Sequence, residues 1–149
     1  MSDPANEKVK TVCPDCGATN LYPPAAEGKK VVCGRCKSGL PLPGTVLEPT
    51  RAQAETILGR SGLPVLVDFF SPTCGPCQLM HPAVERLARR RAGELVVVRI
   101  NVQWEPDLAR AFGVQGVPTF VIVSRGSERD RTSGAMPEED FAFWVASRT

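Results

Sequence analysis

The sequence predicts an α/β domain with a mixed central β-sheet flanked by helices. A small metal-binding module precedes this domain in the chain. Three observations support this prediction. The 149 residues are enough for one full domain and a small module, at about 100–150 residues per domain. Apolar runs at 64–70 and 95–100 flank a helical pattern, as in a strand–helix–strand unit. Hydrophobic residues make up 42% of the chain, which is enough for a packed core.

The composition also narrows the class of protein. No run of 18 apolar residues occurs, so we expect no transmembrane helix. Residues 1–10 are polar and charged and lack the apolar core of a signal peptide, so we expect a cytoplasmic protein. The formal net charge of +2 is too small to indicate nucleic-acid binding by itself.

All six cysteines fall in pairs with two residues between them: Cys13/Cys16, Cys33/Cys36 and Cys74/Cys77. The disulfide framework of a secreted protein fits poorly, because a chain of this length can build a core and shows no export signal. In a reducing compartment, paired cysteines more often bind metal or carry out redox chemistry. The surroundings of each pair must decide between these two kinds of chemistry.

The first two pairs predict a zinc ribbon of short β-hairpins over residues 1–43. Their spacing, C-x2-C-x16-C-x2-C, suits a tetrahedral ion held by four thiolates. A segment of about 30 residues cannot build its own hydrophobic core, so the metal would supply most of its folding energy. Free or disulfide-bonded cysteines and an iron–sulfur centre are the alternatives. The predicted ligands of one Zn²⁺ are Cys13, Cys16, Cys33 and Cys36.

Charge and composition predict a boundary near Gly44, where the second domain, residues 44–149, begins. Residues 1–43 hold six Lys or Arg and four Asp or Glu, whereas residues 44–149 hold twelve of each. Zn²⁺ with four thiolates carries a charge of about −2, which cancels the charge of the module. Within residues 1–43, only Tyr22 offers an aromatic surface for stacking on bases. Nucleic acid is therefore an unlikely partner.

The second domain begins with a helix. Thr50 and Gln53 form a capping-box pattern, and Gly59 and Gly62 are expected to end the helix that follows. Next comes a strand at 64–70 that is apolar enough to be buried on both faces, apart from Asp68 within it. A helix over 76–92 follows, with four apolar side chains expected to face inward: Leu79, Val84, Leu87 and Ala88.

The rest of the chain completes the sheet. We expect a strand at 95–100 parallel to the first, a short helix at 105–112, strands at 119–124 and 128–132 joined by a turn, and a last helix that Pro137 opens. The predicted order is βα, βαβ, α, ββ, α. The inward side chains of the last helix are expected to be Phe141, Trp144 and Val145.

The third cysteine pair lies between a buried strand and the start of a helix. A thiolate at Cys74 would be stabilised there by the partial positive charge and free N–H groups of the helix N-terminus. Cys77 follows one turn later, close enough to form a disulfide with it. A metal site would need two more ligands, and His81 is the only histidine.

With these residues assigned, two segments of the chain resemble thioredoxin: VDFFSPTCGPC at 67–77 and GVPTF at 116–120. The resemblance runs without gaps from about Val65 to Trp144, and its motifs are highly specific. With the ribbon in front, the chain is similar to the bacterial thioredoxins that carry a zinc ribbon, the thioredoxin-2 type. The resemblance implies the thioredoxin fold for residues 44–149.

The resemblance also implies catalytic roles. Cys74 would be the nucleophile, Cys77 the buried resolving thiol, and Asp68 the buried carboxylate that accepts the proton of Cys77. Arg99 stands where the family usually has lysine. It would either hold Asp68 more firmly charged or be a partly exposed strand residue, and both interpretations stay open.

Other family positions concern the substrate. Pro118 matches the cis-proline opposite the disulfide, and Pro82 matches the kink in the active-site helix. Thr73 stands where the family usually has a tryptophan, which implies altered substrate preference, and Phe70 replaces another common tryptophan. The residues expected to bind substrate are Thr73, Gly75, Pro76, Val117, Gly134 and Ala135.

The leading hypothesis is therefore a protein-disulfide reductase with a redox-active Cys74–Cys77 disulfide. Its expected partners are an NADPH-dependent thioredoxin reductase and disulfide-containing client proteins, and we expect a monomer. One alternative is a redox-switched zinc-binding holdase, and another is a nucleic-acid ribbon that carries a redox domain. His81 is expected to be a surface helix residue, and Trp104 a loop residue or core anchor.

Overall fold

The computed structural model describes residues 8–23 and 29–149, so the parts of the predicted ribbon at 1–7 and 24–28 lie outside the described residues. The elements in chain order are β1 (Val9–Val12), β2 (Thr19–Tyr22), β3 (Val46–Leu47), α1 (Arg51–Arg60), β4 (Val65–Phe70), α2 (Gly75–Arg90), β5 (Val96–Asn101), α3 (Pro106–Ala111), β6 (Thr119–Ser124), β7 (Ser127–Ser133) and α4 (Glu138–Arg148).

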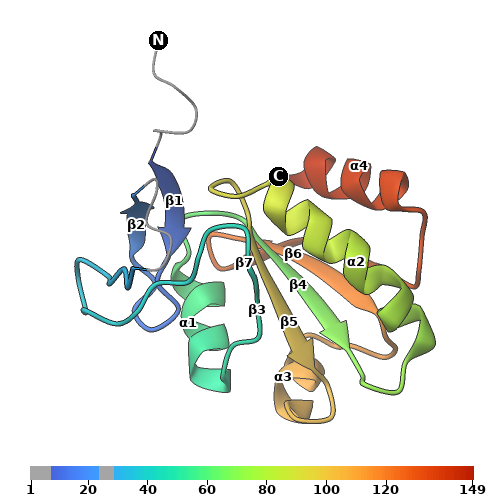
Figure 1. The fold of residues 1–149 in the computed structure, drawn as a ribbon. Helices are drawn as coiled ribbons and strands as arrows, with labels where there is room; N and C mark the ends of the chain where they lie inside the picture. Colours follow the sequence, from blue (N-terminus) through green and yellow to red (C-terminus); the bar gives the residue numbers. More distant parts are fainter. Residues whose placement is uncertain (1–7, 24–28) are drawn as a thin grey trace.

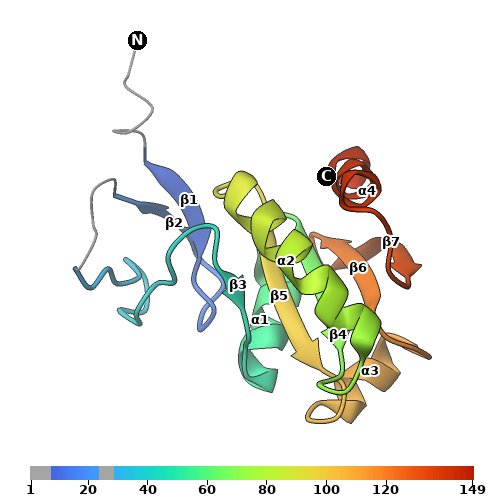
Figure 2. The same ribbon diagram turned by 45° about the vertical axis from the view of Figure 1, so that its right-hand side comes forward.

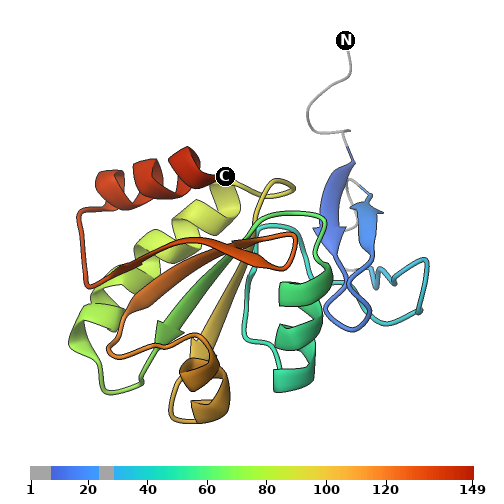
Figure 3. The same ribbon diagram turned by 180° about the vertical axis from the view of Figure 1, so that it is seen from behind.

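The main sheet has five strands in the order β3-β5-β4-β6-β7. Strands β3, β5 and β4 are parallel, whereas β6 and β7 pair in antiparallel fashion, so the sheet is mixed as predicted. Figure 1 shows α2 and α4 on one face of this sheet, and Figure 3 shows α1 and α3 on the other. The short β3 supplies the first strand of the predicted order.

The central strand β4 is buried on both faces, and its side chains alternate between two cores. Leu66 packs with Val84, Leu87 and other side chains of α2 and α4. Val67 packs on the opposite face with Ile57 of α1 and its neighbours. This alternation follows from the period of two along a strand, and it explains why β4 reads as a continuous apolar run.

Helix α1 begins at the predicted capping box. The Thr50 side chain accepts a hydrogen bond from the Gln53 backbone, and the Gln53 side chain accepts one from the Thr50 backbone. The expectation that Gly59 ends this helix is wrong. Gly59 lies in the last turn, and the helix runs on to Arg60. A single glycine costs a helix only about 1 kcal/mol, so the helix can include it.

The predicted inward position of Leu79 in α2 is wrong. Leu79 is 73% exposed, and Met80 is buried in its place. Met80, Val84 and Leu87 follow the i, i+4, i+7 spacing of one helix face, whereas Leu79 lies about 100° away from Met80 around the axis. Two large apolar residues stand side by side here, and the helix can bury only one of them.

The last helix packs as predicted through Phe141 and Val145, which are fully buried. The ring of Phe141 lies 4.8 Å from that of Phe120 in β6, measured between centroids. Trp144 is half-buried, and its Nε1 donates to Asp130.

Trp104 is a loop residue and not a core anchor, because 81% of it is exposed. No helix in the described part of the chain is long and apolar enough to cross a membrane.

The N-terminal strands β1 and β2 form a separate antiparallel pair that lies beside α1 (Figure 2). Val12 of β1 is 2% exposed and belongs to the same core cluster as Ile57 and Val65. Around the second CxxC, the described residues form only an isolated bridge between Val32 and Gly39. The N-terminal segment therefore packs on the main sheet through a shared apolar contact.

Candidate functional site

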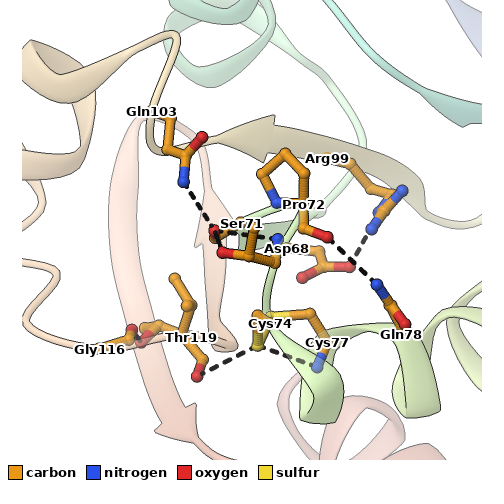
Figure 4. The surroundings of a disulfide bond; sticks show 12 residues. Asp68, Ser71, Pro72, Cys74, Cys77, Gln78, Arg99, Gln103, Gly116 and Thr119 are labelled. Carbon is orange, nitrogen blue, oxygen red and sulfur yellow. Dashed lines mark hydrogen bonds and ion pairs between the residues drawn. A yellow bond between two sulfur atoms is a disulfide. The ribbon is translucent and has the colours of Figure 1, made fainter.

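A disulfide joins Cys74 and Cys77 at the start of α2, just beyond the end of β4 (Figure 4). Cys74 is the N-cap of the helix, and its Sγ accepts a hydrogen bond from the Cys77 backbone N–H at 3.1 Å. Cys77 is 2% exposed, whereas Cys74 is partly exposed. A thiolate formed at Cys74 would therefore be both reachable and stabilised by the helix terminus.

The loop before β6 lies against this disulfide. The Val117–Pro118 peptide bond is cis, as the resemblance implied. The carbonyl oxygen of Val117 lies 3.7 Å from Cys74 Sγ. Gly134, with a φ of +89°, donates its backbone N–H to the Pro118 carbonyl at 2.9 Å. The structure thus places Val117 against Cys74 and Gly134 against the neighbouring Pro118, with Ala135 next in the chain.

Asp68 of β4 lies in the interior and is 2% exposed. Figure 4 shows its carboxylate beside the Arg99 side chain. Burial disfavours its charged form, while the charge and hydrogen bond of Arg99 favour it, and the balance raises the pKa of Asp68 to about 6. Arg99 Nε donates to Asp68 Oδ2 at 3.3 Å. The other oxygen, Oδ1, is buried and has no hydrogen-bond partner among the described residues.

The structure decides between the two interpretations of Arg99. Its side chain is only 12% exposed and lies between two carboxylates, Asp68 and Glu48, with Glu48 Oε1 3.5 Å from the guanidinium. The guanidinium also stacks over the Phe70 ring, 3.8 Å from the centroid. Arg99 is therefore held in place beside Asp68. Sequence reasoning missed Glu48, because nothing in its local pattern indicates this contact.

Sequence reasoning also missed two polar residues at the loop that carries Cys74. The Ser71 hydroxyl accepts a hydrogen bond from Gln103 Nε2 at 3.1 Å and shares one with Thr73 Oγ1 at 3.2 Å. Gln103 comes from the connection between β5 and α3, about 30 residues further along the chain. Ser71 lies inside the recognised motif, but no sequence signal links it to Gln103.

The four N-terminal cysteines form a second cluster. Their sulfur atoms all lie within 4.8 Å of one another. The Sγ atoms of Cys13 and Cys36 are 3.6 Å apart, and those of Cys16 and Cys33 are 3.7 Å apart. A tetrahedral ion with metal–sulfur bonds of about 2.3 Å requires about 3.8 Å between sulfurs. The donor set and its spacing therefore fit a metal ion.

Neighbouring groups donate to the sulfurs of this cluster. The Cys36 backbone and the Asn20 side chain lower the pKa of Cys33 to about 6, and the Asn20 Nδ2 atom lies 3.4 Å from Cys33 Sγ. The Arg35 backbone N–H also donates to this sulfur. Such donors orient and stabilise metal-bound thiolates. Sequence reasoning named the four cysteines but missed Asn20.

The two cysteine sites lie in different parts of the molecule, and the first CxxC turn packs on α1, where Gln53 Nε2 donates to Asp15 Oδ1 at 2.9 Å. The Cys74–Cys77 disulfide follows the last residue of β4, whereas the N-terminal strands approach the loop before β4 begins. At that end, a Cβ built on Gly62 would lie 2.9 Å from Thr19 Oγ1. Figure 1 shows the same separation, with β1 and β2 far from the N-terminus of α2. The cluster therefore does not contribute ligands or thiols to the disulfide site.

A redox-active pair at a helix N-terminus beside a cis-proline, on a mixed sheet, defines a thiol–disulfide oxidoreductase. Comparisons with known proteins agree. The thioredoxin family model matches residues 44–147. Thioredoxin C-3 of Corynebacterium nephridii is 32% identical over 134 residues, which is 90% of this chain and 91% of that protein.

Two further relatives support the same family. Thioredoxin 1 of Chlorobaculum tepidum is 41% identical over 83 residues, which is 56% of this chain and 82% of that protein. A solved thioredoxin variant from Halobacterium salinarum superposes with a TM-score of 0.65 at 31% identity, covering 73% of this chain and 95% of that one. The chain belongs to the thioredoxin family.

Proposed function

We propose that the protein reduces disulfide bonds in client proteins with the Cys74–Gly75–Pro76–Cys77 dithiol. The observation that carries the proposal is the Cys74–Cys77 disulfide at the N-terminus of α2, with one sulfur reachable and the other buried. The different exposure of the two sulfurs supports different roles for them. It favours Cys74 as the sulfur that attacks and Cys77 as the one that resolves.

The reaction transfers two electrons. The Cys74 thiolate attacks one sulfur of the client disulfide, so that a mixed disulfide forms and one client thiolate leaves. The Cys77 thiolate then attacks Cys74 Sγ, which forms the Cys74–Cys77 disulfide and releases the second client thiolate. The proton of Cys77 passes to Asp68, whose pKa of about 6 suits a base near neutral pH.

The client chain would lie against the rim around Cys74. The Val117 backbone, next to the cis-proline Pro118, is free to pair with an extended client segment, as in other strand-addition interfaces. The remaining rim residues of the proposed substrate surface are small or flat, and all lie close to the disulfide or on the two loops beside it: Thr73, Gly75, Pro76, Gly134 and Ala135.

We further propose that an NADPH-dependent thioredoxin reductase returns two electrons and two protons to the disulfide, and that the protein works as a monomer in the cytoplasm. A reducing compartment would also keep the four N-terminal thiols available for metal. These assignments follow the family and the cysteine chemistry.

The N-terminal segment, residues 1–43, is proposed to be a zinc ribbon, which would make the protein a thioredoxin of the thioredoxin-2 type. Bound Zn²⁺ would act as a structural cross-link between the two CxxC turns. Cys13 and Cys33 are fully buried, Cys16 is partly exposed and Cys36 is exposed. The spacing of their sulfurs supports Zn²⁺ coordination, and metal analysis of purified protein tests it.

The exposure of Cys36 also supports the second candidate function, a redox-switched holdase. An oxidant could reach this thiolate, release the metal and free the apolar contact of Val12. This candidate predicts zinc loss under mild peroxide together with new binding of an unfolded client. Zinc that survives this peroxide treatment excludes it.

Reduction of a model protein disulfide, with NADPH and a thioredoxin reductase as electron source, tests the proposed function. The wild-type protein is expected to be active, and Cys74→Ser is expected to lose all activity because the attacking sulfur is gone. Cys36→Ser is the matched control, since it also removes one thiol but from the separate N-terminal cysteine cluster. Equal activity of Cys74→Ser and wild type would contradict the proposal.

A further inference from the structure

Three polar side chains form a hydrogen-bonded chain beside the disulfide. Gln103 Nε2 donates to Ser71 Oγ at 3.1 Å, the Thr73 backbone N–H donates to the same oxygen at 3.4 Å, and Ser71 Oγ lies 3.2 Å from Thr73 Oγ1. Figure 4 shows Gln103 reaching across to Ser71 from a different part of the chain. Ser71 is 9% exposed, whereas Thr73 is exposed.

Counting donors and acceptors gives this chain a direction. A serine hydroxyl has one proton to donate and two lone pairs that accept. Gln103 and the Thr73 backbone use both lone pairs of Ser71. The Ser71 proton must therefore go to Thr73 Oγ1. The proton of the Thr73 hydroxyl itself is then unused within the chain, and it lies on an exposed residue directly before Cys74.

We propose that Thr73 donates this proton to a backbone carbonyl of the client chain, and that Ser71 and Gln103 are positioning residues that keep the proton available. This inference rests on the proposed function. A client segment that pairs with the Val117 backbone is extended, so it presents carbonyl groups on the side away from that pairing. The attacked client sulfur lies at Cys74, and Thr73 is its direct neighbour on the same rim.

The consequence is a preference for peptide disulfides. A polypeptide client offers a carbonyl near its cysteine, whereas a small disulfide without peptide groups offers none. A neutral hydrogen bond of this kind changes the ratio of the two kcat/KM values by about three- to tenfold. That ratio, protein disulfide over bis(2-hydroxyethyl) disulfide, is the quantity to measure, because it cancels changes in the reactivity of Cys74 itself.

Gln103→Glu tests the direction of the hydrogen bonds among Gln103, Ser71 and Thr73 with almost no change in the shape of the side chain. A carboxylate only accepts, so the Ser71 proton would turn toward Glu and Thr73 would have to donate to Ser71. The ratio is expected to fall about three- to tenfold. Gln103→Met is the matched control of similar length. It removes the donor without adding an acceptor, leaves Ser71 free to turn either way, and is expected to lower the ratio less.

A double-mutant cycle separates this effect from the added charge. Thr73→Val removes only the hydroxyl and is expected to lower the ratio as much as Gln103→Glu does. On the Thr73→Val background, Gln103→Glu is expected to cause no further fall, because the proton it would redirect is absent. A charge effect would persist on that background, and such persistence overturns the inference.

The remaining outcomes are also decisive. If Gln103→Glu does not fold, judged by its far-ultraviolet circular dichroism, Ser71→Ala replaces it, since this variant removes the shared oxygen and is expected to lower the ratio. An active wild type whose ratio is unchanged in these variants, or in which Gln103→Met acts as strongly as Gln103→Glu, overturns the inference alone. A wild type that reduces no protein disulfide overturns the proposed function as well.

Discussion

At the scale of single residues, the burial of Asp68 favours the proposed proton transfer but lowers the stability of the fold. Its carboxyl group is buried under apolar strands, and Arg99 compensates only part of the loss of hydration. The same burial that brings its pKa to about 6 makes the ionised form unfavourable in the folded protein. The raised pKa suits Asp68 to proton transfer near neutral pH. For the same reason, its ionised form destabilises the fold at that pH.

The stability of the protein should therefore depend on pH through Asp68. Its pKa is raised from 3.8 to about 6 in the folded state, so between these pH values the folded protein holds a proton that the unfolded chain has released. The free energy of unfolding falls as pH rises through this window, by about 3 kcal/mol in total. Urea unfolding of the oxidised protein measures this.

Asp68→Asn, which cannot ionise, isolates the effect. Its stability relative to wild type is expected to increase by about 2.5 kcal/mol between pH 4 and pH 7.5. Asp107→Asn is the control, because Asp107 is exposed and hydrogen bonds from Arg51 and Arg110 lower its pKa from 3.8. The contribution of Asp107 to stability is lost as the pH falls through 3.8 toward its lowered folded-state pKa. The stability difference between Asp107→Asn and wild type should therefore stay nearly flat from pH 4 to pH 7.5. A flat difference for Asp68→Asn would contradict the account.

Residue types and spacing were enough to predict the chemistry of the cysteine pairs, whereas the roles of Asp68 and Pro118 were predicted from the resemblance to thioredoxin. Glu48, Gln103 and Asn20 could not be predicted in this way. Each acts through a contact with a residue from another element, and no local pattern encodes which loop will lie beside Arg99, Ser71 or Cys33. Their roles depend on how the chain folds back on itself.

At the scale of elements, the strands and helices of the main sheet follow from apolar patterns, turn residues and caps. The bounds of β6 match the prediction, and β4, α2, β5, α3 and β7 begin and end within one or two residues of their predicted bounds, whereas β3 had no predicted range. The face of α2 was harder to predict, because Leu79 and Met80 are adjacent and similar in hydrophobicity. Cys77 decides the phase, since it faces inward and Met80 lies on its side of the helix.

Helix α4 tests the packing of the elements directly. Phe141 is fully buried against Phe120, whereas Phe143 is 75% exposed on the same helix. Phe141→Ala is expected to lower the free energy of unfolding by about 3–5 kcal/mol, because it leaves a cavity in the core. Phe143→Ala is expected to change it by less than about 0.5 kcal/mol. Denaturant unfolding measures both, and similar values for the two variants would contradict the described packing.

At the scale of the whole molecule, the N-terminal segment shares a core with the main sheet, while its four cysteines form a cluster separate from the disulfide. Val12 packs with Ile57 of α1, and a Cβ on Gly17 would lie 2.6 Å from the Cβ of Arg60 in the same helix. The segment is thus closely packed on α1. The sequence indicated a metal module and a boundary near Gly44, but not where the module would dock, because that depends on Val12 and on glycines that permit close approach.

Metal removal should loosen this segment and leave the main sheet folded. Purified protein is expected to hold one Zn²⁺ per chain, because four thiolates complete one tetrahedral site. After chelation, the backbone N–H of Cys13, which donates to Ala18, is expected to exchange with solvent at least tenfold faster, because the metal holds this turn. The amides of β4 serve as the internal control. Unchanged exchange at Cys13 would contradict the structural role of the metal.

The central claim is that Cys74 attacks and Cys77 resolves, and trapping tests it most directly. A Cys77→Ser variant that is incubated with disulfide-containing client proteins should accumulate mixed disulfides, because the second thiol is absent, and mass spectrometry should locate every such bond at Cys74. The Cys74→Ser, Cys77→Ser double variant should trap none. Adducts at one of the four N-terminal cysteines in place of Cys74, or no adducts from Cys77→Ser, would contradict the account.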